Sequence, residues 1–274
     1  MNEQPTNVPY NPLFIDSLNH PLAGPIRKLL TRTGRQELDQ ILIDDEENIL
    51  QALEAGVEIE SVYYAGDEVI SEELRKNLTA GATIHEVAKR TTKKLFENDK
   101  ISRIFAIAET PRPKGLELLK AIKKDIVVLE DLSISGNIGN IIRTSLALDL
   151  GGMILLNMDP LDLYDRRLIR ASRGYMFSFP IMTAATKEFL DYCKTNDETL
   201  LVTAMKAQKT VDEIASIPER LLIVFGSEKE GASPEVEQAA TLQVRIPINE
   251  RVESLNVSVA TGMILYEAMK QRLD

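Results

Sequence analysis

Short apolar segments recur through the second half of the chain, separated by longer stretches with helical spacing. The apolar segments are 126–129, 153–156, 200–204, 221–225 and 244–246. Continuous apolar runs of this length are typical of strands that are buried on both faces, as in parallel sheets covered by helices. Helices are expected over 140–148 and 256–271. This alternation predicts an α/β fold with a mostly parallel sheet.

A smaller α/β series precedes it. Strands are expected over 40–44, 59–64, 83–87 and 101–108, and helices over 46–55, 71–78 and 90–96. The segment from Thr110 to Gly115 contains two prolines and a glycine, which is typical of a linker. We therefore expect a flexible arm over 1–24, an N-terminal domain over 25–110, a linker over 111–124 and a C-terminal domain over 125–274.

The composition excludes several kinds of site. The chain has 274 residues and one cysteine, Cys193, so it has neither an internal disulfide nor a zinc site made of several thiolates. We expect no metal. No apolar run approaches the roughly 20 residues that span a bilayer. The first residues lack the basic and apolar regions of a signal peptide, so a cytoplasmic protein is expected.

The formal net charge of −10 is unusual for a protein that binds nucleic acid. Binding depends on where charge lies, however, and three local clusters are basic. They are Arg27, Lys28, Arg32 and Arg35; then Lys89, Arg90, Lys93 and Lys94; then Arg166, Arg167, Arg170 and Arg173. Each cluster alone is typical of a solvated helix face. Three of them in an acidic protein favour contacts with phosphates.

Several familiar chemistries lack their residues. The sequence contains no G-x-x-x-x-G-K-[ST] phosphate loop, no G-x-S-x-G nucleophile motif and no G-x-G-x-x-G dinucleotide motif. Its two histidines, His20 and His85, lie in the first third of the chain, far from the glycine-bearing segments. Both are interpreted as surface or half-buried residues.

Three glycine-bearing segments follow expected strands, and such loops meet at the carboxyl ends of parallel strands. The first segment, 135–152, contains Gly136 and Gly139 and then Arg143, which we expect near the start of a helix. A cation is unfavourable at that end of a helix. Arg143 is therefore either a surface residue or a group that binds a phosphate or carboxylate.

The other two segments also admit two interpretations. In 221–235 a strand leads to Gly226, Ser227 and Glu228, where a carboxylate fits a hydrogen-bonding role in a crevice, although the segment equally fits a loop before a helix. In 244–267 a strand leads to Ser254 and Asn256, and capping of the following helix is the favoured interpretation of this segment alone.

Taken in order, the three segments resemble the motifs of the SpoU branch of the SPOUT methyltransferases. The motif N-x-G-x-x-x-R corresponds to Asn137, Gly139 and Arg143, the motif G-x-E to Gly226 and Glu228, and the motif I-P…S-L-N-x-S to Ile246, Pro247, Ser254, Leu255, Asn256 and Ser258. The runs GNIGNIIRTSLAL, DRRLIRASRGYMFSFP, LLIVFGSEK and ESLNVSV are similar to the thiostrepton- and nosiheptide-resistance methyltransferases. This likeness is dense over roughly 129–267 and looser before it.

The resemblance implies a fold and a reaction. The C-terminal domain would be a trefoil-knotted SPOUT methyltransferase domain, an exception to the rule that chains do not thread loops. The N-terminal domain would be a small α/β ribosomal-protein-like RNA-binding domain. A homodimer would methylate the 2′-hydroxyl of an adenosine in large-subunit (23S) ribosomal RNA, with S-adenosyl-L-methionine as cofactor. Such methylation confers resistance to thiopeptide antibiotics.

The resemblance also implies roles for individual residues. The catalytic set is Arg143, Asn137, Glu228, Ser254 and Asn256, and the cofactor-binding set is Arg143, Arg173, Thr203, Gly226, Ile246 and Leu255. The family assigns proton removal to the motif arginine, but a guanidinium normally stays protonated. We expect Arg143 instead to position the hydroxyl or adjacent phosphate and stabilise negative charge on oxygen, held by Glu228. For Arg173, contacts with the cofactor carboxylate, with RNA or with a dimer surface remain alternatives. RNA-backbone contacts are expected from Arg27, Lys28, Lys89, Arg90, Lys93 and Lys94.

Three other interpretations remain open. One is a SpoU-type 2′-O-methyltransferase that acts on tRNA or on another rRNA nucleotide. Another is a non-catalytic RNA-binding protein that uses a methyltransferase fold as a scaffold. The third is an unrelated α/β nucleotide-binding enzyme whose loops match by chance.

Overall fold

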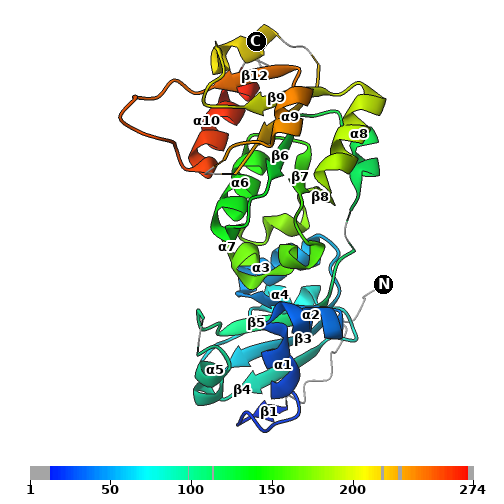
Figure 1. Cartoon of the computed structure of the whole chain (residues 1–274). Coiled ribbons are helices and arrows are strands. Elements are labelled where there is room, and N and C mark those ends of the chain that lie inside the picture. Colours follow the sequence, from blue (N-terminus) through cyan, green and yellow to red (C-terminus); the bar gives the residue numbers. More distant parts are fainter. Residues whose placement is uncertain (1–12, 98, 113, 217–218, 228–229, 271–274) are drawn as a thin grey trace. The chain divides into compact units, whose positions relative to one another are not determined.

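The structure is a computed structural model that describes residues 13–97, 99–112, 114–216, 219–227 and 230–270. The chain divides into two compact units, each built around one sheet (Figure 1). Unit 1 consists of Met1–Arg112 and Leu161–Ser178, and unit 2 consists of Pro113–Pro160 and Phe179–Asp274. The second segment of unit 1 is therefore an excursion of the chain out of unit 2.

Unit 1 contains a five-stranded mixed sheet with the order β1-β4-β3-β5-β2. Its strands are β1 (Phe14–Ile15), β2 (Gln40–Asp44), β3 (Ile59–Ala65), β4 (Thr83–Val87) and β5 (Ile104–Glu109). Its helices are α1 (Ala23–Leu29), α2 (Arg32–Leu38), α3 (Glu46–Glu54), α4 (Glu72–Asn77), α5 (Lys89–Leu95) and α7 (Arg166–Ala171), with 3-10 turns at Pro160–Tyr164 and Tyr175–Phe177. β5 is antiparallel to β2 and β3, whereas β3, β4 and β1 are parallel. The carboxyl ends of β2, β3 and β4 therefore lie at one edge.

The expectation of a flexible arm over 1–24 is wrong for its described part. Phe14 and Ile15 form β1, which pairs with β4, and Ile15 is fully buried in the core of unit 1. Ala23 begins α1 and is buried in the same core. Residues 1–24 contain many polar residues and prolines, and a two-residue strand is too short to show a periodicity. The burial of Ile15 and Ala23 could therefore not be recognised from the sequence.

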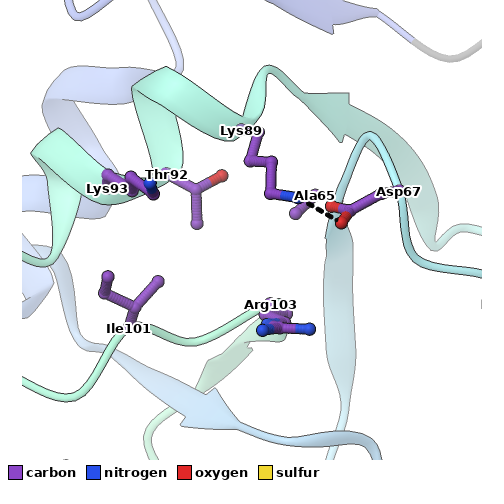
Figure 2. Close-up of a pocket in the computed structure, with 7 residues that line it drawn as sticks. All are labelled: Ala65, Asp67, Lys89, Thr92, Lys93, Ile101 and Arg103. Atoms are coloured by element: carbon purple, nitrogen blue, oxygen red, sulfur yellow. Dashed lines mark hydrogen bonds and ion pairs between the residues drawn. The ribbon is translucent and has the colours of Figure 1, made fainter.

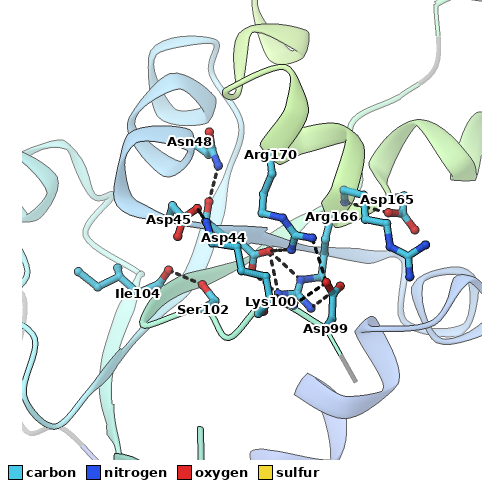
Figure 3. A network of polar contacts seen from close by, with 11 residues as sticks. Asp44, Asp45, Asn48, Asp99, Lys100, Ser102, Ile104, Asp165, Arg166 and Arg170 are labelled. Atoms are coloured by element: carbon cyan, nitrogen blue, oxygen red, sulfur yellow. Dashed lines mark hydrogen bonds and ion pairs between the residues drawn. The ribbon is translucent and has the colours of Figure 1, made fainter. Parts of the chain in front are cut away.

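Polar side chains hold the excursion 161–178 against the rest of unit 1 (Figure 3). The carboxylate of Asp44, at the end of β2, accepts hydrogen bonds from Arg166 Nε at 2.9 Å, Arg166 Nη2 at 2.8 Å and Arg170 Nη1 at 2.5 Å. Both arginines also reach Asp99, and the Arg166 guanidinium lies 4.5 Å from the ring centroid of Phe96. Asp44 is 1% exposed and Arg166 is 4% exposed, so this is a buried charge network.

The environment of Asp99 keeps its carboxyl group charged within the network. Burial raises the pKa of this carboxyl, but the backbone N–H of Lys100 and the charges of Arg170 and Arg166 outweigh burial and lower its pKa below the usual value. The network also corrects two expectations. The domain expected over 125–274 loses 161–178 to unit 1, and Arg166 and Arg170 of the third basic cluster pair with carboxylates rather than facing solvent.

Unit 2 contains a seven-stranded sheet with the order β10-β12-β9-β11-β6-β7-β8, and every pairing in it is parallel. The strands are β6 (Ile126–Glu130), β7 (Gly152–Leu156), β8 (Ile181–Ala184), β9 (Thr199–Thr203), β10 (Lys209–Thr210), β11 (Leu221–Phe225) and β12 (Leu242–Arg245). The helices are α6 (Ser135–Ala147), α8 (Thr186–Asn196), α9 (Pro234–Ala239) and α10 (Val257–Lys270), with 3-10 turns at Leu116–Lys120 and Val211–Ser216. The α/β fold with a parallel sheet is confirmed.

The central strands of unit 2 are buried on both faces. Val128 and Val224 face a core that includes Phe189 of α8 and Val236 of α9. Alternate residues such as Val127 point to the opposite face and are equally buried, because successive side chains of a strand alternate. Figure 1 shows α6 and α10 on one side of this sheet and α8 on the other.

Two local expectations need correction. The linker expected over 111–124 is partly structural, since Leu116 and Leu119 are buried in the core of unit 2. The helix expected over 140–148 begins five residues earlier, at Ser135. Ile138, Ile141 and Ile142 recur on one buried face of α6, and their burial compensates for the helix-weakening glycines at 136 and 139.

Within the described ranges, no helix is both long and apolar enough to cross a membrane. Nor do His, Cys, Asp or Glu side chains of those residues gather into a group suited to a metal ion.

Candidate active site

The carboxyl edge of the unit 2 sheet brings together residues that are distant in sequence. β12, β9 and β11 are neighbours, and Val244 pairs with Thr203, the last residue of β9. Gly226 directly follows β11 and Ile246 directly follows β12. Because all three strands are parallel, their following loops leave from one edge of the sheet. Gly226 is buried, and Thr203 and Ile246 are half-buried.

Gly226 begins a loop that closes on itself. The backbone N–H of Ser227 donates to the Gly231 carbonyl at 2.9 Å, and the N–H of Gly231 donates back at 3.0 Å. A Cβ at position 226 would lie 1.9 Å from the Gly231 carbonyl carbon, and Gly231 has a φ of +76°. Any side chain at 226 would therefore open the loop. Glu228, the expected partner of Arg143, lies in this loop but outside the described residues.

A hydrogen bond joins the first and third motif segments. Asn256 Nδ2 donates to Asn137 Oδ1 at 3.2 Å across 119 positions of sequence. Asn256 also caps α10, because its Oδ1 accepts from the Ser258 N–H at 2.9 Å and from Ser258 Oγ at 2.5 Å. Asn256 is thus both a helix cap and a link to Asn137, so its two sequence interpretations are compatible.

Arg143 lies on α6, exposed to solvent. It is six residues beyond Asn137, which corresponds to roughly 9 Å along a helix axis. It is the ninth residue of α6 rather than a residue of its first turn, so the argument from the helix terminus was wrong. Thr144, its neighbour, faces α10 close to Gly262, where a Cβ would lie 3.8 Å from Thr144 Cγ2. Arg143 therefore borders the contact between α6 and α10.

Sequence reasoning missed Glu130, a 2% exposed carboxylate at the end of β6. It accepts hydrogen bonds from Thr186 Oγ1 at 3.1 Å and from both Ser233 N–H and Ser233 Oγ at 2.8 Å. Ser233 caps α9 and follows the Gly226 loop, so Glu130 fixes the far end of that loop. An acidic residue that ends an apolar strand was the signal available in the sequence.

Nucleophilic catalysis by a thiolate does not fit this unit. Cys193 is buried in the core on α8, and burial raises the pKa of its thiol to about 12. The thiol therefore stays protonated near neutral pH. His85, in unit 1, is buried rather than at the surface or half-buried as expected, and burial together with the nearby His20 lowers its pKa.

Comparison with known proteins decides the family. The profile of the SpoU rRNA methylase family matches residues 124–266, and the profile described as the N terminus of thiostrepton-resistance methylase matches residues 12–122. The chain belongs to the SpoU rRNA methylase family. This is the family that the resemblance implied, and the matched range 124–266 includes the three glycine-bearing segments up to residue 266.

Individual relatives agree with this assignment. A 23S rRNA (adenosine(1067)-2′-O)-methyltransferase of Streptomyces azureus is 34% identical over 94% of this chain and 97% of its own length. The enzyme of the same name from Streptomyces laurentii is 36% identical over 89% of this chain and 91% of its own length. A crystal structure of an AdoMet-bound rRNA methyltransferase from Sinorhizobium meliloti, 26% identical, superposes with a TM-score of 0.82 over 95% of this chain and 98% of that one.

The SpoU cofactor is S-adenosylmethionine, and the strand-end residues fit it. Thr203 and Ile246 are half-buried beside the buried main chain of Gly226, and Leu255, also half-buried, lies in the loop between β12 and α10. Small and apolar side chains that are only partly exposed suit the flat adenine of a nucleoside cofactor. Ser254 is exposed in the same loop as Leu255.

The remaining SpoU candidates lie in unit 1. Arg173 follows α7, is exposed and has a φ of +52°. The six residues expected to contact RNA are all exposed: Arg27 and Lys28 on α1, and Lys89, Arg90, Lys93 and Lys94 on α5. By contrast, Arg35 of the first cluster is 2% exposed and lies 3.9 Å from Asp165.

Proposed function

We propose that this protein transfers the methyl group of S-adenosylmethionine to the 2′-hydroxyl of an adenosine in 23S ribosomal RNA. The observation that carries the proposal is the Asn137–Asn256 hydrogen bond, which joins two SpoU motif segments, and Arg143 lies further along the same helix, α6, as Asn137. The two Streptomyces relatives, 34% and 36% identical over most of the chain, support adenosine as the target. Because the N-terminal region of this chain matches the profile described as the N terminus of thiostrepton-resistance methylase, resistance to thiopeptide antibiotics is the expected consequence.

Each residue of the site has a distinct proposed role. When bound, S-adenosylmethionine supplies a methyl group on a positively charged sulfur. Arg143 donates hydrogen bonds to the ribose oxygen or the adjacent phosphate and stabilises the negative charge that develops on that oxygen. Asn137 and Asn256 hold α6 and the start of α10 together, with Ser254 beside them, so that alignment is built in before substrate binds. Glu228 is the proposed partner of Arg143.

The remaining parts of the proposal follow from the family. Unit 1 binds RNA through α1 and α5, and the reaction takes place in the cytoplasm, where ribosomal RNA is found. The trefoil knot in unit 2 and the contact of Arg173 with cofactor or RNA stay predictions.

A tritium assay tests the reaction. With tritiated S-adenosylmethionine and a 23S rRNA fragment that contains the adenosine 1067 hairpin, we expect label in the RNA. The same fragment with a 2′-deoxyadenosine at the target should take up none, because the accepting oxygen is missing.

Label that persists in the 2′-deoxy fragment would exclude ribose methylation of that nucleotide. Label in tRNA or in another rRNA segment alone would favour a SpoU enzyme of different target. Tight RNA binding without any transfer would favour the non-catalytic scaffold.

An apolar stripe on α10 supports a homodimer. Val259, Met263 and Tyr266 are each about half exposed and recur at positions four and three apart, so they lie on one face of the helix. Ile134 and Leu146 at the two ends of α6 are exposed as well. We propose that a second copy of the chain covers the apolar face of α10, together with exposed side chains of α6, which contacts α10.

Replacing Met263 with glutamate should convert a dimer into a monomer, because an isologous interface would bring two copies of the buried charge together. Sedimentation velocity measures the change, and methyl transfer should fall with it. Val69→Glu is the matched control, since Val69 is an exposed apolar residue of unit 1. A wild-type chain that sediments as a monomer, or an M263E variant that still dimerises, rules this interface out.

A further inference from the structure

Unit 1 has a cavity of about 180 Å³ at the carboxyl edge of its sheet (Figure 2). Ala65, the last residue of β3, and Thr92 of α5 line it and are both buried. Ile101, which precedes β5, also lines it and is 43% exposed. In Figure 2, α5 lies on one side of the open space, and Ile101 and Arg103 lie on the other. The cavity thus has a small apolar interior that solvent reaches.

Three cations surround this interior. Lys89 and Lys93 lie one turn apart on the same face of α5, and Arg103 comes from the opposite side. Lys89 Nζ donates to Asp67 Oδ2 at 2.6 Å, and Asp67 is the carboxylate among the lining residues. The lining therefore carries three positive charges and one negative charge. This local excess contrasts with the net charge of −10 on the whole chain.

The ion pairs at the cavity do not block an anion. The side chains of Lys89 and Arg103 are 63% and 69% exposed, although Arg103 Nη1 also donates to Glu68 Oε1 at 3.0 Å. Pairs this exposed contribute only about 0–1 kcal/mol, because water screens both charges. A phosphate with two or three cations around it competes with such pairs, and Arg103 offers a planar guanidinium that matches phosphate oxygens.

Size and chemistry together indicate the occupant. Pockets that enclose a whole drug-sized ligand measure about 300–1,000 Å³, so 180 Å³ suits a single planar group. A nucleobase offers an apolar face to Ile101 and Thr92, and its phosphate carries the charge that the rim lacks. Only an unstacked base can present both, because a base inside a double helix hides its faces.

We infer that this cavity binds one unpaired nucleotide of the RNA substrate, with its base against Ile101 and its phosphate at Lys93 and Arg103. The inference rests on the proposed action on ribosomal RNA and adds a second contact point, separate in the sequence from the methyl-transfer residues. Its role is to recognise a loop or bulge of the RNA rather than the nucleotide that is methylated.

RNA affinity measured at several salt concentrations distinguishes the base contact of the cavity from its phosphate contact. The probe is the fluorescein-labelled 23S rRNA fragment with the adenosine 1067 hairpin, titrated with the full chain at several salt concentrations. Ile101→Ala should weaken binding about fivefold at an unchanged salt slope, because it removes an uncharged base contact. The double variant Lys93→Ala/Arg103→Ala should reduce the salt slope by about 0.7, since it removes the contact with one phosphate of a single strand.

Matched controls remove the same groups elsewhere in unit 1. Leu13→Ala deletes another exposed apolar side chain, and Lys76→Ala deletes a lysine that pairs with Glu72 on α4. Both should bind RNA as the wild type does. All four variants should melt at the wild-type temperature, because the cavity side chains that are changed are solvent-exposed.

The outcomes distinguish this inference from the proposed function. S-adenosylmethionine affinity should be unchanged in the cavity variants, because none of the changed residues lies in unit 2. If the wild type methylates the fragment but the cavity variants bind it as the controls do, the inference is wrong and the proposed function stands. If the wild type binds the fragment without methylating it while the variants weaken as described, the inference stands alone. A wild type that binds no RNA overturns both.

Discussion

Replacing Arg143 with alanine should lower the rate constant of methyl transfer about 10²–10³-fold, while binding of S-adenosylmethionine stays measurable. Arg143 is exposed on α6, so its removal leaves no cavity and the fold should persist. The large effect comes from losing a fixed donor at the oxygen where negative charge develops. Single-turnover transfer to the adenosine 1067 fragment measures the chemical step, and calorimetry measures cofactor binding.

Arg143→Lys is the matched variant, because lysine keeps the charge but loses the planar fork of five donors. We expect it to recover only part of the lost rate. If lysine restores full activity, Arg143 acts through its charge alone rather than through directed hydrogen bonds. Near-normal turnover of the alanine variant would exclude Arg143 from the reaction altogether.

Replacing Asp44 with asparagine should destabilise unit 1 by about 3–5 kcal/mol. The Asp44 carboxylate is 1% exposed and accepts from two arginines, Arg166 and Arg170. A neutral amide leaves both guanidinium groups with Asp99 as their shared carboxylate, in a region where unpaired charge is costly. Asparagine has nearly the same shape, so the loss reports charge rather than packing.

Hydrogen–deuterium exchange measures this loss locally. Peptides from β2 and from 161–178 should exchange about 100- to 5,000-fold faster in the variant, because opening of this region becomes easier by the same about 3–5 kcal/mol. Peptides from the β9 and β11 strands of unit 2 serve as an internal reference. Asp45→Asn is the matched control, since Asp45 adjoins Asp44 but makes an exposed pair with Lys100 at 2.8 Å.

The control should change stability by no more than about 1 kcal/mol. Equal effects at the two positions would mean that burial of the network adds nothing. A β2 that keeps its protection while 161–178 loses it would show that the excursion detaches without weakening the sheet. In that case the network holds 161–178 against unit 1 but does not stabilise the core of the unit.

Much of the fold follows from the local pattern of apolar residues. The strands expected over 40–44 and 83–87 coincide with β2 and β4, and the strand expected over 221–225 coincides with β11. Burial of a strand on both faces requires an uninterrupted apolar run, which is visible in any short window of sequence. The helix expected over 71–78 corresponds to α4, and the Ser71 side chain caps it by accepting from the Leu74 N–H.

The candidate site was predictable in its members but not in its contacts. The motif residues Asn137, Gly226 and Asn256 were identified by type and spacing. The Asn137–Asn256 hydrogen bond depends on which strands become neighbours in the sheet. So do the two backbone hydrogen bonds between Ser227 and Gly231 that close the Gly226 loop. Glu130 was missed because its partners, Thr186 and Ser233, follow it by 56 and 103 positions.

The sequence by itself determined the parallel sheet of unit 2, the α/β character of both units and the residues of the SpoU motifs, because each depends on residue types at short spacing. Only the tertiary structure determined which partners the charged side chains have. Arg166 and Arg170 form a basic cluster in the sequence, yet their partner Asp44 lies 122 and 126 positions away. Whether an arginine meets RNA or a buried carboxylate depends on long-range pairing, because electrostatic energy follows distance in space and burial rather than order along the chain.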